Sequence, residues 1–148
     1  MRVLSIAIFS ILFAATAAIA GFTLKSGVYR VNELDAVKAE ALSTKKAIAF
    51  LYSDESTFCT QCSGASVQAM ETLAGSSLVV YVDKSGATKL PKQVQTALRS
   101  PEAGKYIPVV VVMSYDLRKV IAVVPFARGD AHKKLLSEAK EKILSYGK

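Results

Sequence analysis

Uninterrupted runs of apolar residues alternate along the chain with segments in which apolar residues recur every three or four positions. The uninterrupted runs lie at residues 47–53, 77–83 and 109–115, and they contain few polar residues. Such runs are typical of strands buried on both faces, which belong to sheets that helices cover on both sides. Shorter apolar segments at residues 27–31 and 119–126 predict two further strands.

Helical spacing appears between these strands and after the last one. The first helix is expected to run to residue 46, and Asn32 is expected to cap it. Its apolar positions are Leu34, Val37, Ala41 and Leu42. A second helix opens at residues 59–62 and is expected to stop at Gly75. A weaker helical pattern covers residues 91–98, and Asp130 is expected to cap a final helix. The apolar stripe of that helix is Leu135, Leu136, Ala139, Ile143 and Leu144.

The order of these elements predicts an α/β fold. Strands that alternate with helices favour parallel pairing through right-handed crossovers. Residues 116–118 are too few for a crossover, so the last two strands form an antiparallel hairpin. We therefore expect a mixed sheet of about five strands with helices on both faces.

The first twenty residues have the pattern of an export signal. Arg2 precedes an apolar stretch, and residues 18–20 (Ala-Ile-Ala) match the small-residue pattern of a signal peptidase site. Cleavage there leaves Gly21 as the new N-terminus, whereas an uncleaved segment is long enough to act as a membrane anchor. We expect residues 1–20 to be a signal peptide or N-terminal anchor, and residues 21–148 to form one domain exported to the periplasm or cell envelope.

The charge of the chain narrows the choice of partners. The formal net charge is +7, and it falls to +6 if Arg2 is removed with the signal segment. Many of the lysines lie on the predicted C-terminal helix, where a solvated helix face explains them. No aromatic residues are interleaved with arginines there, so we expect no nucleic-acid partner. We expect a monomer that contacts a membrane only if residues 1–20 are retained.

The two cysteines of the chain, Cys59 and Cys62, are three residues apart at the start of a predicted helix. A helix N-terminus favours negative charge, which lowers the pKa of a thiol and raises its thiolate fraction. Cys62 lies one turn further on, where it can attack a mixed disulfide formed at Cys59. A purely structural disulfide gains little from closing so small a loop. Two thiolates suit Cu(I), whereas tetrahedral zinc needs four ligands. We expect His132, the single histidine, to face solvent or cap its helix, and we expect neither a metal nor a cofactor.

The segment CTQC after a buried strand, and Tyr-Ile-Pro before the terminal hairpin, make nearly the whole chain after residue 20 resemble the thioredoxin family. The resemblance implies a thiol–disulfide oxidoreductase that acts on protein thiols and disulfides of the cell envelope, with Cys59 and Cys62 as its redox-active disulfide. It also implies that Pro108 is cis and that the backbone of Ile107 pairs with a substrate strand.

The sequence departs from this family near the cysteines. The chain has no tryptophan, Phe58 precedes the first cysteine, and Thr60 and Gln61 replace the Gly-Pro pair of thioredoxins. The buried acid of the family has no counterpart in residues 47–53. A specialised relative is therefore favoured over a general electron donor. A non-catalytic binding module with a structural disulfide, and a Cu(I) delivery protein, remain the alternatives.

Overall fold

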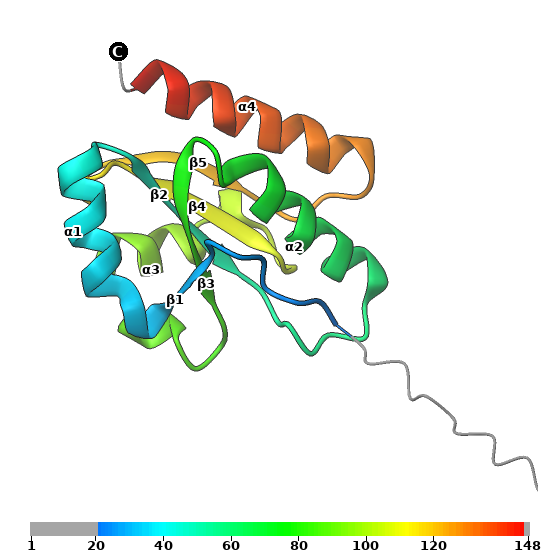
Figure 1. Ribbon diagram of the computed structural model, residues 1–148. Helices are drawn as coiled ribbons and strands as arrows, with labels where there is room; N and C mark the ends of the chain where they lie inside the picture. The colour runs from blue at the N-terminus through cyan, green and yellow to red at the C-terminus, as the bar shows by residue number, and fades with distance from the viewer. Residues whose placement is uncertain (1–20, 147–148) are drawn as a thin grey trace, which may run out of the picture.

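The sheet at the centre of the computed structural model has five strands in the order β1-β3-β2-β4-β5 (Figure 1). The structure describes residues 21–146, so the expected signal segment lies outside the described residues. The strands are β1 (Tyr29–Arg30), β2 (Ala47–Tyr52), β3 (Ser77–Val82), β4 (Val109–Met113) and β5 (Val120–Val124). Strand β3 pairs in parallel with both β1 and β2, and β4 runs antiparallel to β2 and to β5. The predicted central strand and terminal hairpin are both confirmed.

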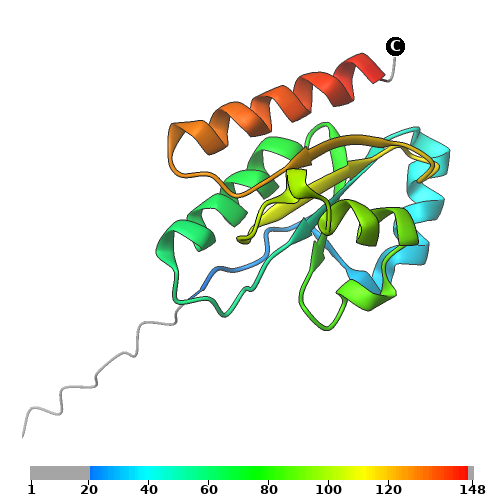
Figure 2. The same cartoon turned by 180° about the vertical axis from the view of Figure 1, so that it is seen from behind.

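Four α-helices cover the two faces of this sheet. They are α1 (Leu34–Thr44), α2 (Thr60–Leu73), α3 (Lys92–Leu98) and α4 (Asp130–Tyr146). Helices α2 and α4 lie on one face, and α1 and α3 lie on the other, as the two opposite views show (Figures 1 and 2). Short 3₁₀ turns occupy Val31–Glu33, Ala87–Lys89 and Pro101–Ala103. No helix within residues 21–146 is both long enough and apolar enough to cross a membrane.

Alternation along the strands divides the apolar core into two layers. In β2, Ala47, Ala49 and Leu51 point toward α2 and α4, whereas Ile48 and Phe50 point toward α1 and α3. All five side chains are buried because the strand is central and both of its faces are covered. The uninterrupted apolar runs of the sequence therefore mark the three inner strands, as predicted. The sheet order, the mixed pairing and the two helical layers give the predicted thioredoxin-like α/β fold.

Several element boundaries differ from the prediction. The edge strand β1 has two residues instead of five, because residues 31–33 turn into a 3₁₀ helix. The Glu33 carboxylate accepts a hydrogen bond from the Arg30 backbone N–H at 2.7 Å, and Asn32 caps nothing. Helix α1 ends at Thr44 because Lys45 has a left-handed backbone conformation, with φ of 58°. Leu42 and Leu144, which were expected on apolar stripes, are 51% and 55% exposed.

Candidate active site

Cys59 and Cys62 form a disulfide at the N-terminus of α2, with their Cα atoms 5.2 Å apart. Cys59 is the N-cap residue, and its extended backbone precedes the first helical residue, Thr60. The backbone N–H of Cys62 donates to the Cys59 Sγ at 3.2 Å. Cys59 is exposed and Cys62 is half-buried, so the first sulfur is more accessible to a partner. This backbone donor is aimed at the atom that would carry negative charge if Cys59 became a thiolate.

The Ile107–Pro108 peptide bond is cis, as the resemblance implies, and it lies directly before β4. Ile107 lines a cleft of about 440 Å³ together with both cysteines. The strand order places β4 beside β2, and α2 follows β2, so the cis-proline turn and the disulfide meet at one end of the sheet. The cleft is completed by Gln61, Tyr106, Phe126, Ala127 and Arg128. The structure thus brings Cys59, Cys62 and Ile107 into one cleft, and the cis peptide bond joins Pro108 to Ile107.

Large exposed aromatic side chains lie next to the disulfide in the chain and at the cleft. Phe58, directly before Cys59, is 90% exposed, and Tyr106 is 72% exposed. Single exposed apolar residues are ordinary on protein surfaces. Here one aromatic ring directly precedes the accessible sulfur and another lines its cleft, so exposed apolar surface adjoins Cys59.

A buried pair of hydroxyl groups connects the end of β2 to the first turns of α2. The Ser66 hydroxyl donates to the Cys62 carbonyl oxygen at 2.9 Å, and the hydroxyls of Ser53 and Ser66 are 2.7 Å apart. Because Ser66 has one hydroxyl hydrogen, Ser53 must be the donor in the second bond. Both serines are at most 2% exposed. Ser53, the residue directly after β2, is thus neutral, in agreement with the missing acid noted in the sequence.

Two carboxylates lie near Ile107 without lining the cleft at Cys59. Asp54 and Asp83 border a second cavity that Ile107 also lines. The pKa of Asp54 is lowered by hydrogen bonds from the Ser56 hydroxyl and backbone N–H. The pKa of Asp83 is lowered first by the Ser85 hydroxyl and then by a backbone N–H. Both groups therefore stay ionised near neutral pH, and they are exposed to solvent.

His132 is buried, and the expectation that it faces solvent or caps its helix is wrong. Its side chain is on α4, is 1% exposed, and has its Nε2 atom 3.3 Å from the Ala65 carbonyl oxygen of α2. Its Nδ1 atom has no hydrogen-bond partner within residues 21–146. Burial lowers the pKa of His132, and the backbone carbonyls of Ala65 and Pro125 oppose this shift only in part, although the Pro125 carbonyl does not meet hydrogen-bond geometry. The neutral ring therefore joins α4 to the helix that carries the cysteines.

The described residues offer no preformed metal centre. Within residues 21–146, no group of three or more histidine, cysteine, aspartate or glutamate side chains is close enough to hold a metal ion. The two cysteines are bonded to each other, and thiolates rather than a disulfide bind metals. A tetrahedral zinc site therefore does not fit the residues around the disulfide.

Sequence reasoning missed the residues that surround the cysteines in space. Ser66 follows Cys62 by four residues, which on a helix points to a side chain-to-carbonyl bond, and this spacing was available in the sequence. Phe126, Ala127 and Arg128 follow β5, and only the strand order brings them to the cleft. No local signal marks them.

Comparison with solved structures found matches at low sequence identity. One structure, described as DsbH oxidoreductase, has 16% sequence identity and a TM-score of 0.47, over 90% of this chain and 95% of that chain. Another, a disulphide isomerase from Xylella fastidiosa Temecula1, has 18% identity and a TM-score of 0.41, over 78% of this chain and 86% of that chain. A scan against protein-family models and a search of curated proteins each gave no match.

The sequence identities and TM-scores of these matches are too low to support an activity. The fold assignment therefore rests on the geometry of the chain itself. The sheet order, the cis-proline before β4 and the disulfide that opens α2 occur together at one end of the sheet. Residues 21–146 therefore form a thioredoxin-like fold that carries a CxxC disulfide.

Proposed function

We propose that this protein is a thiol–disulfide oxidoreductase that exchanges disulfides with proteins of the cell envelope. The observation that carries the proposal is the position of Cys59: an exposed sulfur at the N-cap of a 14-residue helix, in one cleft with Ile107 of the cis-proline turn. A static disulfide needs neither an exposed sulfur nor an adjoining cleft. The chain-entropy gain from so short a loop is small, so stability alone is a poor reason for this disulfide.

The exchange chemistry needs only the two cysteines and a partner. In the reducing direction the Cys59 thiolate attacks one sulfur of a substrate disulfide, which forms the Cys59–substrate bond and releases the other substrate sulfur as a thiolate. Cys62 then loses its proton and attacks Cys59 Sγ, which closes the Cys59–Cys62 bond and releases the second substrate thiolate. Two electrons pass to the substrate, and both released thiolates take up protons. The oxidising direction is the reverse sequence, with the substrate thiolate attacking first.

Substrate binding is assigned to the surface around the cleft. An extended substrate segment can pair with the backbone at Ile107, as in β-strand addition. Phe58 and Tyr106 then supply apolar contact, since both rings are largely exposed. An extended polypeptide that reaches Cys59 can contact both rings, because Tyr106 lines the cleft and Phe58 directly precedes Cys59.

The location of the activity follows from the predicted export signal. Disulfide chemistry is sustained in oxidising compartments such as the periplasm, and the sequence pattern of residues 1–20 supports delivery there. The substrates are accordingly envelope proteins with exposed disulfides or cysteine pairs.

Two matched serine variants test the proposal. Cys62→Ser keeps the attacking thiol but removes the escape step, so it should accumulate mixed disulfides with envelope proteins. Cys59→Ser also replaces one sulfur atom with oxygen, but it removes the attacking thiol. It should therefore accumulate few mixed disulfides. Both species are visible as adducts that reducing agent removes on non-reducing gels. Equal trapping by both variants, or none by either, together with absence of insulin-disulfide reduction, would leave a binding module with a structural disulfide.

The reduction potential of the Cys59–Cys62 pair determines whether the protein reduces or oxidises its substrates. Equilibration of the Cys59–Cys62 pair with glutathione gives this value directly. A potential near that of thioredoxin, about −270 mV, assigns a reductase, and one near that of DsbA, about −120 mV, assigns an oxidase.

A further inference from the structure

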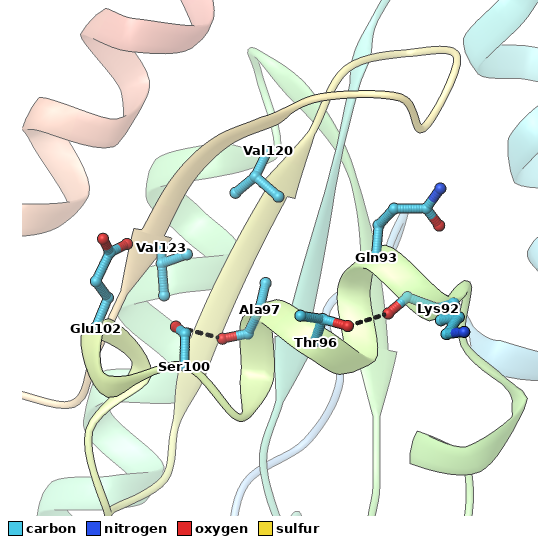
Figure 3. Close-up of a pocket in the computed structure, with 8 residues that line it drawn as sticks. All are labelled: Lys92, Gln93, Thr96, Ala97, Ser100, Glu102, Val120 and Val123. Atoms are coloured by element: carbon cyan, nitrogen blue, oxygen red, sulfur yellow. Dashed lines mark hydrogen bonds between the residues drawn. The ribbon is translucent and has the colours of Figure 1, made fainter.

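Cavities of different character adjoin the cleft at Cys59. One of about 350 Å³ lies between the first half of α2 and the start of α4, and we call it the α4 cavity. It shares Gln61, Ala127 and Arg128 with the cleft, so it extends the candidate active site. The groove between α3 and β5 that Figure 3 shows has no lining residue in common with the cleft, so it does not extend the site.

The α4 cavity carries positive charge. Among the described residues, Arg128 and Lys133 line it, and no aspartate or glutamate does. Lys133 pairs with the exposed Asp130 at 3.4 Å, whereas Arg128 takes part in none of the ion pairs within residues 21–146. Gln61 and Gln68 also line the cavity, and their side-chain amides can donate hydrogen bonds. An anion that enters here therefore meets the Arg128 guanidinium and two amide donors.

A cavity of about 390 Å³ adjoins the cleft at Ile107 and has the opposite character. Asp54 and Asp83 line it together with Lys84. Hydrogen bonds from serine hydroxyl and backbone N–H groups lower the pKa of both carboxyl groups, so both are ionised near neutral pH. The cleft therefore borders negative charge at Ile107 and positive charge at Arg128. This difference gives a charged polypeptide in the cleft a preferred sequence and orientation.

The position of Arg128 relative to the accessible sulfur determines which part of a substrate it meets. Arg128 and Cys59 line the same cleft, and Gln61, between the two cysteines, lines both the cleft and the α4 cavity. Neighbouring residues of an extended polypeptide are about 3.3 Å apart along the strand. A side chain within a few residues of the reacting cysteine therefore reaches the α4 cavity while that cysteine is bonded to Cys59.

We propose that the α4 cavity is a substrate subsite that binds an acidic side chain close to the reacting cysteine of the substrate polypeptide, with Arg128 as its principal cation. The proposal rests on the proposed exchange activity of Cys59 and adds the class of substrate, namely polypeptides whose cysteine is flanked by aspartate or glutamate. A carboxylate there accepts hydrogen bonds from the Arg128 guanidinium and from the amide of Gln61 or Gln68. A lysine or arginine at the same place is repelled, so the subsite also rejects partners.

Two activated peptides of equal length test the proposal. Each carries one cysteine as a mixed disulfide with thionitrobenzoate, flanked on both sides by glutamates in one peptide and by lysines in the other. The Cys59 thiolate of the reduced protein attacks the peptide sulfur, and thionitrobenzoate leaves with the electron pair of the broken bond, so its absorbance gives the rate. Each rate constant is divided by that of the same peptide with dithiothreitol, which removes differences in intrinsic reactivity. The assay is run at about pH 7.5, where His132 is neutral because burial lowers its pKa.

The ratio of the two normalised rate constants measures the preference. We expect the wild-type protein to react about fivefold faster with the glutamate-flanked peptide at low ionic strength, and high salt should bring the ratio toward one. Arg128→Glu should lower the ratio at least about fivefold, because it reverses the charge of the subsite. Arg118→Glu makes the same charge change in the turn between β4 and β5, at the end of β4 away from Pro108, and should leave the ratio unchanged. Any effect of Arg128 on the Cys59 thiolate acts on both peptides alike, so it cancels in the ratio.

The outcomes separate this subsite from the exchange activity on which it rests. If the wild-type protein releases thionitrobenzoate from neither peptide while dithiothreitol releases it from both, the exchange activity is overturned and the subsite with it. Release from both peptides with a normalised ratio of one, or an equal ratio in the wild-type protein and Arg128→Glu, would overturn the subsite alone. Misfolding of Arg128→Glu would slow both reactions together, so it cannot produce a selective loss with the glutamate-flanked peptide.

Discussion

The two faces of the sheet are built differently. Between the sheet and helices α1 and α3, the buried side chains are apolar throughout the core cluster. The face toward α2 and α4 also holds buried polar groups, among them Ser53, Ser66 and His132. The disulfide opens α2 and therefore belongs to the second face. The comparison places the buried serines, His132 and the disulfide on the same face of the sheet.

The hydrogen bonds on the polar face explain this difference. A polar group buried without a partner is costly, so such groups persist where they hold something in place. Ser66 fixes the carbonyl of Cys62, and His132 joins α4 to the carbonyl of Ala65, one turn further along α2. Both contacts restrain the helix whose N-terminus faces the Cys59 sulfur.

The largest loss of stability is expected from a cavity between the sheet and helices α1 and α3. Phe50 is fully buried between β2 and helices α1 and α3. Phe50→Ala should lower the free energy of unfolding by about 3–5 kcal/mol, because it removes a large side chain from a packed core. Urea unfolding measures this loss. If that face serves stability alone, the reduction potential of the variant stays at the wild-type value, and a shifted potential would show that it does not.

A smaller effect is expected from the serine pair on the polar face. Ser66→Ala removes the acceptor of the buried Ser53 hydroxyl and should cost about 1–3 kcal/mol of unfolding free energy. Ser53→Ala leaves the bond from Ser66 to Cys62 intact and should cost less. The double variant removes both hydroxyls, so its cost, measured by urea unfolding, should be smaller than the sum of the two single costs.

The reduction potentials of the same serine variants test whether the buried hydroxyls influence the disulfide. We expect Ser66→Ala to shift the reduction potential of the disulfide, since its bond ends on the carbonyl of Cys62. Ser53→Ala serves as the control, because it keeps that bond. Equal potentials in the wild-type protein and both variants would show that the pair is purely structural.

His132 should make the stability depend on pH. Because burial lowers its pKa below the ordinary value of 6.5, the unfolded chain binds a proton more readily than the folded protein does. The contribution is fully present above pH 6.5 and decreases as pH falls toward the lowered folded pKa, with a slope of at most about 1.4 kcal/mol per pH unit. Urea unfolding from roughly pH 5 to pH 8, the range in which histidine titrates, measures this slope. His132→Gln should reduce this slope. An unchanged slope would show that other titrating groups cause the pH dependence.

The smallest effect is expected at Leu144. This residue lies on α4 but is 55% exposed, so Leu144→Gln should change the unfolding free energy by no more than about 0.5 kcal/mol. Ile143, its neighbour on the same helix, is 6% exposed, and Ile143→Ala should cost about 2–5 kcal/mol. Thermal unfolding of the two variants compares their losses of stability. A large loss for Ile143→Ala and a small one for Leu144→Gln would show that Ile143 packs in the core and Leu144 does not.

Sequence patterns predicted the parts of the fold that local chemistry determines. Uninterrupted apolar runs located β2, β3 and β4, because a strand covered on both faces carries few polar residues. The position of Cys59 at the start of α2 followed from the predicted elements, and the cis bond at Ile107–Pro108 was implied by the resemblance to the thioredoxin family. The catalytic roles of these residues remain predictions.

Sequence reasoning missed one contact between distant segments and one local contact at a helix start. His132 is buried because α4 packs against α2, and its partner Ala65 is 67 positions away in the chain. The start of α1 is displaced because Glu33 bonds back to Arg30. Single-helix periodicity contains neither contact, so it misplaced the cap at Asn32 and left His132 at the surface.

The attachment of the N-terminal segment has a practical consequence. The backbone N–H of Phe22 bonds to the Glu55 carbonyl, and a Cβ atom at Gly21 would lie 1.8 Å from the same oxygen. Glu55 belongs to the loop that leads to Cys59, whereas the C-terminal end of α4 lies on the far side of the molecule (Figure 1). An affinity tag, fluorophore or surface tether joined at residue 21 would therefore crowd the loop before the disulfide. The same attachment after Tyr146 leaves that loop free, so immobilisation and labelling belong at the C-terminal end.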